Sequence, residues 1–314
     1  MKEKLTFRQI MEKNDITICP EIYDCLSAKA VELCNFELVM ISSAEFATAL
    51  QGNPDLGFLT LDDYVHACYY ISRATKLPLL VDADDCFGGP LRVFNACKRM
   101  AEAGAQGILI VDQDLDNGGI LPIKKAVEKF KAAKAAMEGT DCLLIARCDV
   151  DPLTDLDEAI ERCNRYHEAG ADLTLIVKLN AVKDREQRAK ILDRIGKEVQ
   201  GWKMYPDLGA TDGKPDVDVD EIARYGFKLV GIHYLMYAAF EGMLDYGHHI
   251  YQDRSNVYFN KYNDTGVEFN AAAQFFGVED GYWESVEAKF VDDPAERKSV
   301  WMRHFVMETL KGNK

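Results

Sequence analysis

Three aspartates stand close together in one short segment, residues 79–90, directly after a run of apolar residues. Residues two apart on a β-strand point to the same side, so we expect Asp82 and Asp84 to share one face at a strand end. Two like charges at one place need a cation, and an all-oxygen site suits Mg²⁺ or Mn²⁺. The alternative is that the aspartates cap a helix beginning near Pro90. A cap needs only one aspartate, so the pattern favours a metal site.

Eight short, apolar, β-rich runs predict the strands that must position these aspartates. They cover residues 16–19, 38–41, 77–81, 107–111, 143–146, 173–177, 202–205 and 229–232. Helical patterns separate them, which is typical of a parallel sheet, and eight such units close into a barrel. The alternative, an open doubly wound sheet, is disfavoured because no glycine-rich dinucleotide loop follows the first strand. The sequence therefore predicts an α/β protein, a (β/α)8 TIM barrel with additional C-terminal helices, whose active site lies at the C-terminal mouth.

The chain continues beyond the predicted barrel. We expect residues 1–252 to form the barrel domain, ending in a helix over 235–251, and residues 253–314 to form a linker and C-terminal helices. The helical patterns at 268–276, 282–290 and 294–311 carry aromatic and aliphatic residues at helical spacing. An apolar tail of this kind needs a surface to cover, either its own barrel or a partner subunit.

The charge balance limits the partners. The 37 basic and 52 acidic residues give a net charge of −15, which repels nucleic-acid backbones and anionic membrane surfaces. An anionic small molecule stays compatible, because a metal ion and local arginines override the global charge inside a site. The nine cysteines include no C-x-x-C pair, and no apolar run is long enough to span a bilayer. We expect reduced thiols and a cytoplasmic protein.

The aspartate segment has a family resemblance. The run D-A-D-D-C-F-G from Asp82 resembles the D-A-D-x-G-[FY]-G signature of the isocitrate lyase and phosphoenolpyruvate mutase superfamily, with Cys86 in place of the first glycine. Further motifs follow the family's order: P-E-I-Y-D-C-L-S-A from Pro20 (family P-G-x-Y-D-A-L-S-A), S-S-A from Ser42 (S-G-A), P-D-L-G from Pro54, and A-R-C-D from Ala146 (A-R-T-D). The similarity covers roughly the first half of the chain. Each motif is weak alone, but together they are specific.

The resemblance implies a substrate and roles for individual residues. The substrate would be a small carboxylate, a 2-oxo or 2-hydroxy acid. The residues expected to bind its carboxylate are Ser42, Ser43 and Ala44. Asp82 and Asp84 would hold Mg²⁺ or Mn²⁺ with Asp55 close by, and Arg147 would bind a substrate anion. For Arg147 the alternative is a salt bridge to Asp149 or Asp151.

The chain also departs from the family pattern. Val111 replaces the glutamate of an I-E-D-Q motif, and the K-[KR]-C-G-H loop, whose cysteine donates a proton in the lyases, is replaced by residues 114–119 without a thiol. A glutamate expected after the sixth strand is replaced by Val177 and Lys178. Ordinary isocitrate or methylisocitrate cleavage is therefore disfavoured.

Three residues are candidate replacements. Lys178 can neutralise a substrate anion or, if desolvated, form a Schiff base, and an ordinary salt bridge is the alternative. His233, at the end of the eighth strand, can carry a proton or serve as a structural histidine. Tyr23 can line the site or donate a hydrogen bond, and core packing is its alternative.

These observations lead to a prediction of function. We expect a metal-dependent lyase that cleaves a C–C or P–C bond of a small 2-oxo or 2-hydroxy carboxylate through an enolate-like intermediate. Without the thiol acid, decarboxylase, aldolase or phosphonopyruvate-type chemistry fits better. The alternatives are a catalytically silent barrel acting as a binding or assembly component, and an enzyme using a Lys178 Schiff base without metal. The resemblance also implies a homodimer or homotetramer with exchanged C-terminal helices.

Overall fold

The computed structural model describes residues 5–115, 117–258 and 281–311. The chain divides into two compact units, Met1–Met236 and Tyr237–Lys314. This division falls before the expected domain boundary at residue 252. Most of the helix predicted over 235–251 therefore belongs to the C-terminal unit.

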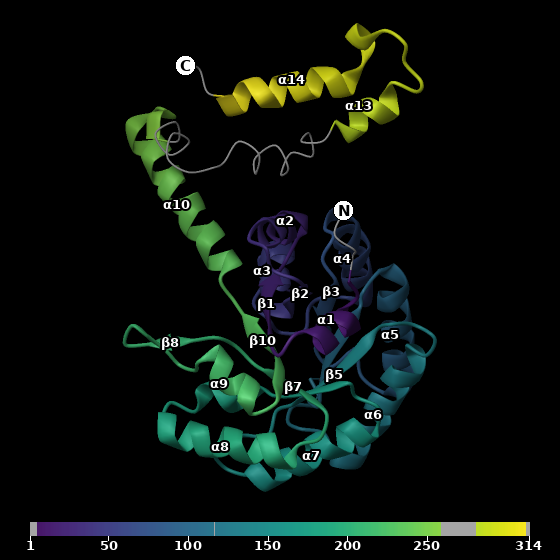
Figure 1. The fold of residues 1–314 in the computed structure, drawn as a ribbon, viewed down its shortest axis with the longest axis vertical. Helices are drawn as coiled ribbons and strands as arrows, with labels where there is room; N and C mark the ends of the chain where they lie inside the picture. The colour runs from purple at the N-terminus through teal and green to yellow at the C-terminus, as the bar shows by residue number, and fades with distance from the viewer. Residues whose placement is uncertain (1–4, 116, 259–280, 312–314) are drawn as a thin grey trace. The chain divides into compact units, whose positions relative to one another are not determined.

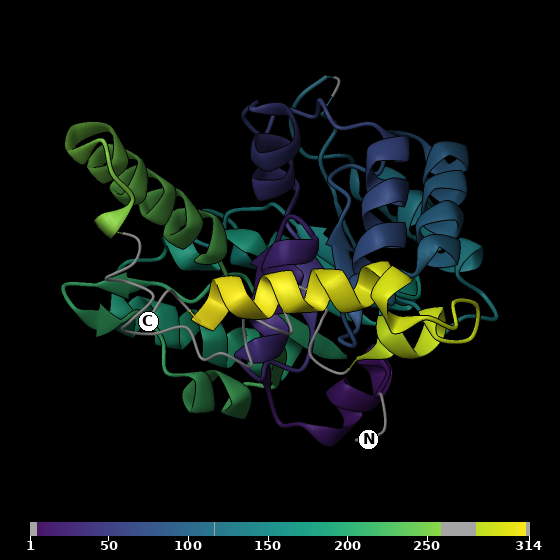
Figure 2. The ribbon, with the colours of Figure 1, turned by 90° about the horizontal axis from the view of Figure 1, so that it is seen from above.

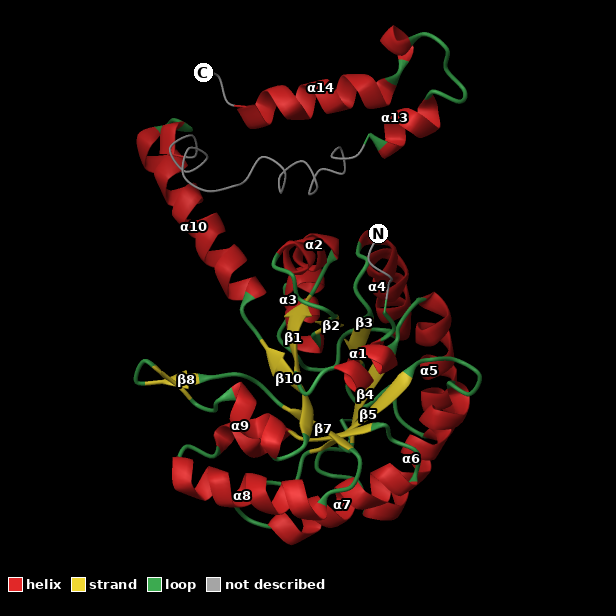
Figure 3. Ribbon diagram, viewed as in Figure 1, coloured by secondary structure: helices red, strands yellow, loops and turns green. Residues whose placement is uncertain are grey.

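The first unit is a closed barrel of eight parallel strands (Figure 3). The strands are β1 (Thr17–Ile22), β2 (Val39–Ile41), β3 (Leu79–Asp82), β4 (Gly107–Val111), β5 (Leu143–Cys148), β6 (Leu173–Ile176), β7 (Trp202–Tyr205) and β10 (Phe227–Ile232). Their order around the barrel is β1-β10-β7-β6-β5-β4-β3-β2. A separate antiparallel pair, β8 (Ala210–Thr211) and β9 (Lys214–Pro215), follows β7. The predicted (β/α)8 barrel is confirmed.

Helices surround these strands in the barrel unit, as the two perpendicular views show (Figures 1 and 2). They are α1 (Phe7–Lys13), α2 (Cys25–Leu33), α3 (Ser43–Gln51), α4 (Leu61–Ala74), α5 (Pro90–Ala103), α6 (Ile123–Ala136), α7 (Leu156–Glu168), the 3₁₀ helix η1 (Val177–Ala181), α8 (Arg185–Glu198) and α9 (Val219–Arg224). Local sequence sets several of the helix starts. Thr60 and Asp63 form a capping box at α4, and Pro90 occupies the first turn of α5.

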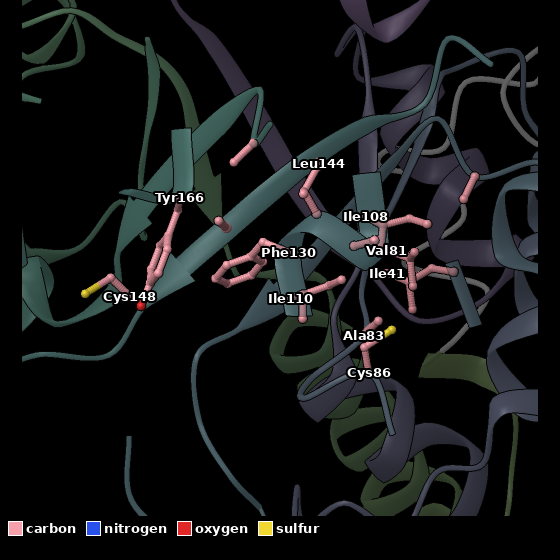
Figure 4. Packing of buried hydrophobic residues seen from close by; sticks show 14 of the residues in the cluster. Ile41, Val81, Ala83, Cys86, Ile108, Ile110, Phe130, Leu144, Cys148 and Tyr166 are labelled. Atoms are coloured by element: carbon pink, nitrogen blue, oxygen red, sulfur yellow. The ribbon is translucent and has the colours of Figure 1, made fainter. Parts of the chain in front are cut away.

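Alternation along the strands divides the apolar side chains between two cores. Leu80 belongs to the cluster inside the barrel, whereas Leu79 and Val81 belong to the cluster between strands and helices. Figure 4 shows part of this outer cluster, including Ile41, Val81, Ile108, Ile110 and Phe130. Since side chains alternate, Asp82 continues the inward series begun by Leu80. The first aspartate of the motif therefore faces the barrel axis.

Helix α1 contributes to the interior core, although the charged start of the chain predicted no element there. Its residues Phe7, Ile10 and Met11 join the cluster inside the barrel. A Cβ atom on Gly107 would lie 2.9 Å from the ring of Phe7. Glycine at the start of β4 thus allows the phenylalanine to pack against the strands.

The C-terminal unit is helical. It contains most of α10 (Leu235–Asp253), together with α13 (Tyr282–Glu287), the 3₁₀ helix η2 (Pro294–Glu296) and α14 (Lys298–Lys311). Glu284 of α13 pairs with Arg303 of α14 at 3.3 Å. The helix predicted over 268–276 and most of the predicted linker lie outside the described residues. None of the described helices has the length and apolar composition needed to cross a membrane.

Candidate active site

The structure brings Asp82 and Asp84 together at the C-terminal end of β3. The backbone N–H of Asp84 donates to Asp82 Oδ1 at 3.1 Å, and Asp84 has a left-handed backbone with φ 51°. The Asp84 carboxylate also accepts hydrogen bonds from the Tyr64 hydroxyl, at 3.0 Å, and from the Ser43 side chain. Both neighbours fix the direction in which this carboxylate points.

The electrostatics of the aspartate pair are those of a site prepared for a cation. Burial and repulsion from Asp84 raise the pKa of Asp82 to about 8. Burial and repulsion from Asp55 raise the pKa of Asp84. Nearby positive charge would oppose both effects.

Few side chains of the protein are placed to bind a metal ion. Among the residues that the structure describes, no group of three or more His, Cys, Asp or Glu side chains is arranged to hold a metal ion by itself. Asp82 and Asp84 therefore fit a cation that takes one or two protein carboxylates and completes its shell with water and substrate, as Mg²⁺ does. The position of the family's glutamate is apolar, because Val111 packs inside the barrel beside Arg147.

Arg147 on β5 joins the aspartates to a second carboxylate. Its Nη1 lies 3.9 Å from Asp82 Oδ2, and its Nε and Nη2 donate to the two oxygens of Asp149 at 2.8 and 3.1 Å. The salt bridge to Asp149 considered from the sequence is thus present. The Arg147 side chain is 24% exposed, so part of it stays accessible to a ligand.

A buried network behind the site holds Asp149. Its backbone N–H donates to Asp112 Oδ1 at 2.9 Å. The other Asp112 oxygen accepts from the Tyr166 hydroxyl at 2.6 Å and from Arg162 at 3.3 Å, both on α7. Helix α7 therefore supports the orientation of Arg147 through two intermediate carboxylates.

The S-S-A segment lies at the start of α3. Ser42 is the N-cap, and its hydroxyl accepts from the backbone N–H of Glu45 at 3.4 Å. Ser43 and Ala44 open the helix, where free N–H groups and the helix dipole favour an anion. Because Ser43 also bonds Asp84, these amides lie beside the metal candidate. Asp55, on the loop before α4, is exposed and acts on Asp84 through its charge.

His233 belongs to a second polar cluster, at the ends of β1 and β10. Its Nε2 lies 2.9 Å from Glu21 Oε2, and its Nδ1 lies 3.4 Å from Asp207 Oδ1. Burial favours a low pKa for His233, but the bonds to Asp207 and Glu21 outweigh it and raise the pKa to about 11. His233 is therefore an imidazolium at neutral pH, which makes it a poor proton acceptor there.

Glu45 faces the same cluster from α3. Burial raises the pKa of its carboxyl to about 7; the positive charge of His233 opposes this shift, whereas Glu21 and Asp207 add to it. Neither carboxyl oxygen has a hydrogen-bond partner among the described residues.

Two further residues were predicted for the site, Lys178 and Tyr23. Lys178 is exposed on η1, so it lacks the desolvation that a Schiff-base lysine requires. Tyr23 borders a groove of about 430 Å³ that His66 and Tyr70 of α4 also line. Cys86 is buried with its Sγ 3.8 Å from that of Cys97, and Figure 4 shows it next to Ala83.

Four residues of the site were not predicted from the sequence: Glu21, Glu45, Tyr64 and Asp207. Asp149 was considered only as an alternative salt-bridge partner of Arg147. Glu21 had a usable signal, since it stands where the family motif has glycine. Asp207 had one as well, since it is a polar residue just after a strand. Tyr64 and Glu45 sit on helices and carried no local signal.

Comparison with known proteins identifies the family of the chain. A family model described as phosphoenolpyruvate phosphomutase matches residues 7–248. The chain belongs to the phosphoenolpyruvate phosphomutase family. The family expected from the motifs is thereby confirmed.

Individual relatives place the chain within this family. The 2-methylisocitrate lyase of Bacillus subtilis is 35% identical over 231 residues, which cover 71% of this chain and 73% of the relative. The petal death protein of Dianthus caryophyllus is 32% identical over 64% of this chain and 66% of its own length. A solved structure of phosphonopyruvate hydrolase with oxalate and Mg²⁺ has a TM-score of 0.77 at 21% identity, covering 92% of this chain and 99% of that one. At this identity the structural likeness shows the fold alone.

Proposed function

We propose that the protein is a Mg²⁺- or Mn²⁺-dependent lyase that cleaves a C–C or P–C bond of a small 2-oxo or 2-hydroxy carboxylate. The observation that carries the proposal is the pair of repelling, largely buried carboxylates of Asp82 and Asp84, which face Arg147 at the barrel mouth. A cation would neutralise the negative charge of the aspartate pair, and an anionic ligand would neutralise the positive charge of Arg147 and of the cation.

The residues around this pair suit a carboxylate ligand. The N-terminus of α3, at Ser43 and Ala44, offers backbone N–H groups to an anion. Arg147 offers the exposed part of its side chain from β5, and Asp149 fixes the plane of the guanidinium. A substrate carboxylate between them would hold the adjacent carbonyl next to Asp82 and Asp84.

A bound divalent ion would polarise that carbonyl and stabilise an enolate formed when the neighbouring bond breaks. Asp84 is held for this role by Tyr64 and Ser43, so its carboxylate needs little reorganisation. The replaced cysteine loop, residues 114–119, brings no thiol to the mouth, and His233 is held protonated. The proposal therefore favours reactions whose product takes its proton from water or from a substrate group.

The relatives support this class of chemistry. One is named for cleavage of 2-methylisocitrate, a C–C bond, and another for hydrolysis of phosphonopyruvate, a P–C bond. The latter is described in complex with oxalate and Mg²⁺. Oxalate resembles the enolate of a 2-oxo acid in its charge and its paired oxygens, so it is a suitable probe for this chain.

The test is a turnover assay on metal-stripped protein with a panel of small 2-oxo and 2-hydroxy acids. We expect one acid to be cleaved only after Mg²⁺ or Mn²⁺ is added, and Asp82→Asn to abolish the reaction. Asp157→Asn is the matched control, because Asp157 is exposed on α7 and pairs with Arg194. Cleavage that persists without metal or in Asp82→Asn would refute the proposal.

A second candidate function rests on Val111. Because Val111 is apolar, one carboxylate of the expected metal shell is missing. A catalytically silent barrel with a binding or assembly role would tolerate this loss. Such a protein would give no turnover with any acid in the panel, with or without metal.

We also propose a cytoplasmic homodimer or homotetramer. The exposed aromatic side chains of the C-terminal unit, among them Trp283, Trp301 and Phe305, support association of subunits. Sedimentation of the protein as a single 35.4 kDa chain would contradict this assembly.

A further inference from the structure

The part of the barrel mouth formed by the ends of β1 and β10 has no role in the chemistry proposed above. Glu21 continues the inward series of β1, because Cys19, two residues earlier, belongs to the cluster inside the barrel. Its Oε2 lies 2.9 Å from Nε2 of His233, which follows β10. These two side chains therefore meet on the inner wall of the mouth.

Ion pairs and close packing hold this pair in place. Glu21 is only 5% exposed, and a Cβ atom on Gly231 would lie 3.1 Å from its Oε1, so the carboxylate packs directly against β10. The other ring nitrogen of His233, Nδ1, lies 3.4 Å from Asp207 Oδ1, which also accepts from the His233 backbone N–H at 3.3 Å. Neither side chain can turn away from the mouth without breaking an ion pair.

The strand order shows which part of a substrate would meet this pair. The groups proposed to bind the 2-oxo carboxylate come from one half of the closed ring: Ser43 follows β2, Asp82 ends β3, and Arg147 lies on β5. The ends of β7, β10 and β1, with Glu21 and His233, belong to the other half. The end of the substrate away from its 2-oxo carboxylate, its remote end, therefore extends toward this pair.

The mouth is narrow enough for one side chain to limit what fits. Strands about 4.8 Å apart and tilted by about 36° enclose a barrel roughly 15 Å wide between opposite backbones. Strand β1 lies opposite β5, so Glu21 and Arg147 project inward from facing walls. Side chains fill most of the interior of an eight-stranded barrel. The room left for the remote end therefore depends on the size of these side chains.

The pair takes up room that a smaller residue would leave open. Glu21 stands where the family motif has glycine, which would place no side chain there. Because both ring nitrogens of His233 are engaged by carboxylates, its partly exposed ring presents a fixed wall and no free hydrogen-bonding group. A branched remote end would have to displace an ion pair in a close-packed interior, which is costly.

We propose that Glu21 and His233 are specificity-determining residues that restrict the remote end of the substrate to a small, unbranched group. Glu21 sets this limit by its size, and Asp207 positions the ring of His233. This inference rests on the proposed function and narrows its substrate class to short 2-oxo or 2-hydroxy acids.

The test measures calorimetric dissociation constants with Mg²⁺ for 2-oxo acids that end in methyl, ethyl, isopropyl or isobutyl groups. We expect the wild type to bind the isopropyl and isobutyl acids at least about tenfold more weakly than the methyl acid. Glu21→Ala, which removes most of the side chain, should reduce this ratio to about twofold or less. Glu21→Gln, which keeps the size and removes the charge, should retain the wild-type ratio. Ratios are compared within each variant, so a general change in affinity cancels.

The outcomes separate the two proposals. Equal binding of all four acids by the wild type would overturn this inference, and that result does not depend on the folding of any variant. A wild-type ratio in Glu21→Ala, or loss of the ratio in Glu21→Gln, would also overturn it, because the size of Glu21 would not be the cause. Mg²⁺-dependent oxalate binding by the wild type would still uphold the proposed function in these cases. Absence of such binding would overturn the proposed function and this inference with it.

Discussion

The hydroxyl of Tyr64 donates a 3.0 Å hydrogen bond to Asp84 Oδ2 from within the outer core of the barrel. The tyrosine ring is held edge-on between Phe46 and Phe87, with centroid distances of 5.8 and 5.9 Å. Tyr64 thus contacts both the aromatic core and a candidate metal ligand. Tyr64 sets the orientation of Asp84 through packing as well as through hydrogen bonding.

Tyr64→Phe should weaken Mg²⁺ binding in the presence of oxalate by about tenfold, because a hydrogen bond to a charged carboxylate is lost while the ring contacts remain. Titration calorimetry measures the effect, with Tyr70→Phe on the exposed face of the same helix as the control. Equal dissociation constants for Tyr64→Phe and the wild type would show that Asp84 needs no such support.

Asp149→Asn should weaken oxalate binding about tenfold, because the amide no longer offers two acceptor oxygens to Arg147 and the guanidinium loses its fixed plane. In turnover the loss should appear mainly as a higher KM. Asp157→Asn, which removes an exposed carboxylate, serves as the control. A normal KM in Asp149→Asn would mean that Arg147 is oriented by other contacts.

Asp112→Ala should lower the free energy of unfolding by about 3–5 kcal/mol, since the Tyr166 hydroxyl, the Asp149 backbone N–H and Nη1 of Arg162 lose the buried carboxylate that they share. Arg162 keeps its ion pair with Glu158 at 2.8 Å. Urea unfolding gives the value. The matched change Asp193→Ala, at an exposed pair with Lys197, should cost under about 1 kcal/mol. Similar losses in the two variants would contradict the assignment of Asp112 as the anchor of the buried network.

Glu45→Gln should stabilise the protein at pH 8 but not at pH 4.5. The folded pKa of about 7 lies above the ordinary value of 4.5, so the wild type loses stability as the pH rises between these values. The full difference amounts to roughly 3 kcal/mol. Chemical denaturation at several pH values measures it, and a pH-independent effect of the substitution would contradict the buried, unpartnered state of Glu45.

His233 gives the wild type a second pH dependence of the same sign. Its folded pKa of about 11 lies above the ordinary 6.5, so its stabilisation is complete below pH 6.5 and is lost as the pH rises through 11. We therefore expect wild-type stability to fall steadily above neutral pH. In His233→Gln this alkaline part of the decline should be missing.

The sequence predicted the site residues that lie at the ends of strands. Asp82, Asp84, Ser43 and Arg147 all follow directly from apolar runs, and the barrel's topology brings such positions together. The residues at which the strands begin and end were less predictable. Strand β1 continues through Pro20 to Ile22, because these last residues pair with β10 and β2.

The rest of the site depended on tertiary packing. Tyr64 lies in the middle of α4 in an ordinary helical pattern, and only the distance to Asp84 gives it a role. Glu45 reads as a helix-start residue, and nothing in the sequence shows that it is buried next to His233. Helix α1 escaped prediction because Phe7, Ile10 and Met11 are surrounded by charged residues.

The most direct test of the central claim is calorimetric titration of metal-stripped protein with oxalate, in the presence and absence of Mg²⁺, for the wild type and for Asp84→Asn. We predict that oxalate binds the wild type at least about tenfold more tightly with Mg²⁺ and that Asp84→Asn removes this dependence. Oxalate binding that is independent of Mg²⁺, or a metal dependence that survives in Asp84→Asn, would contradict the assignment of Asp82 and Asp84 as the metal site.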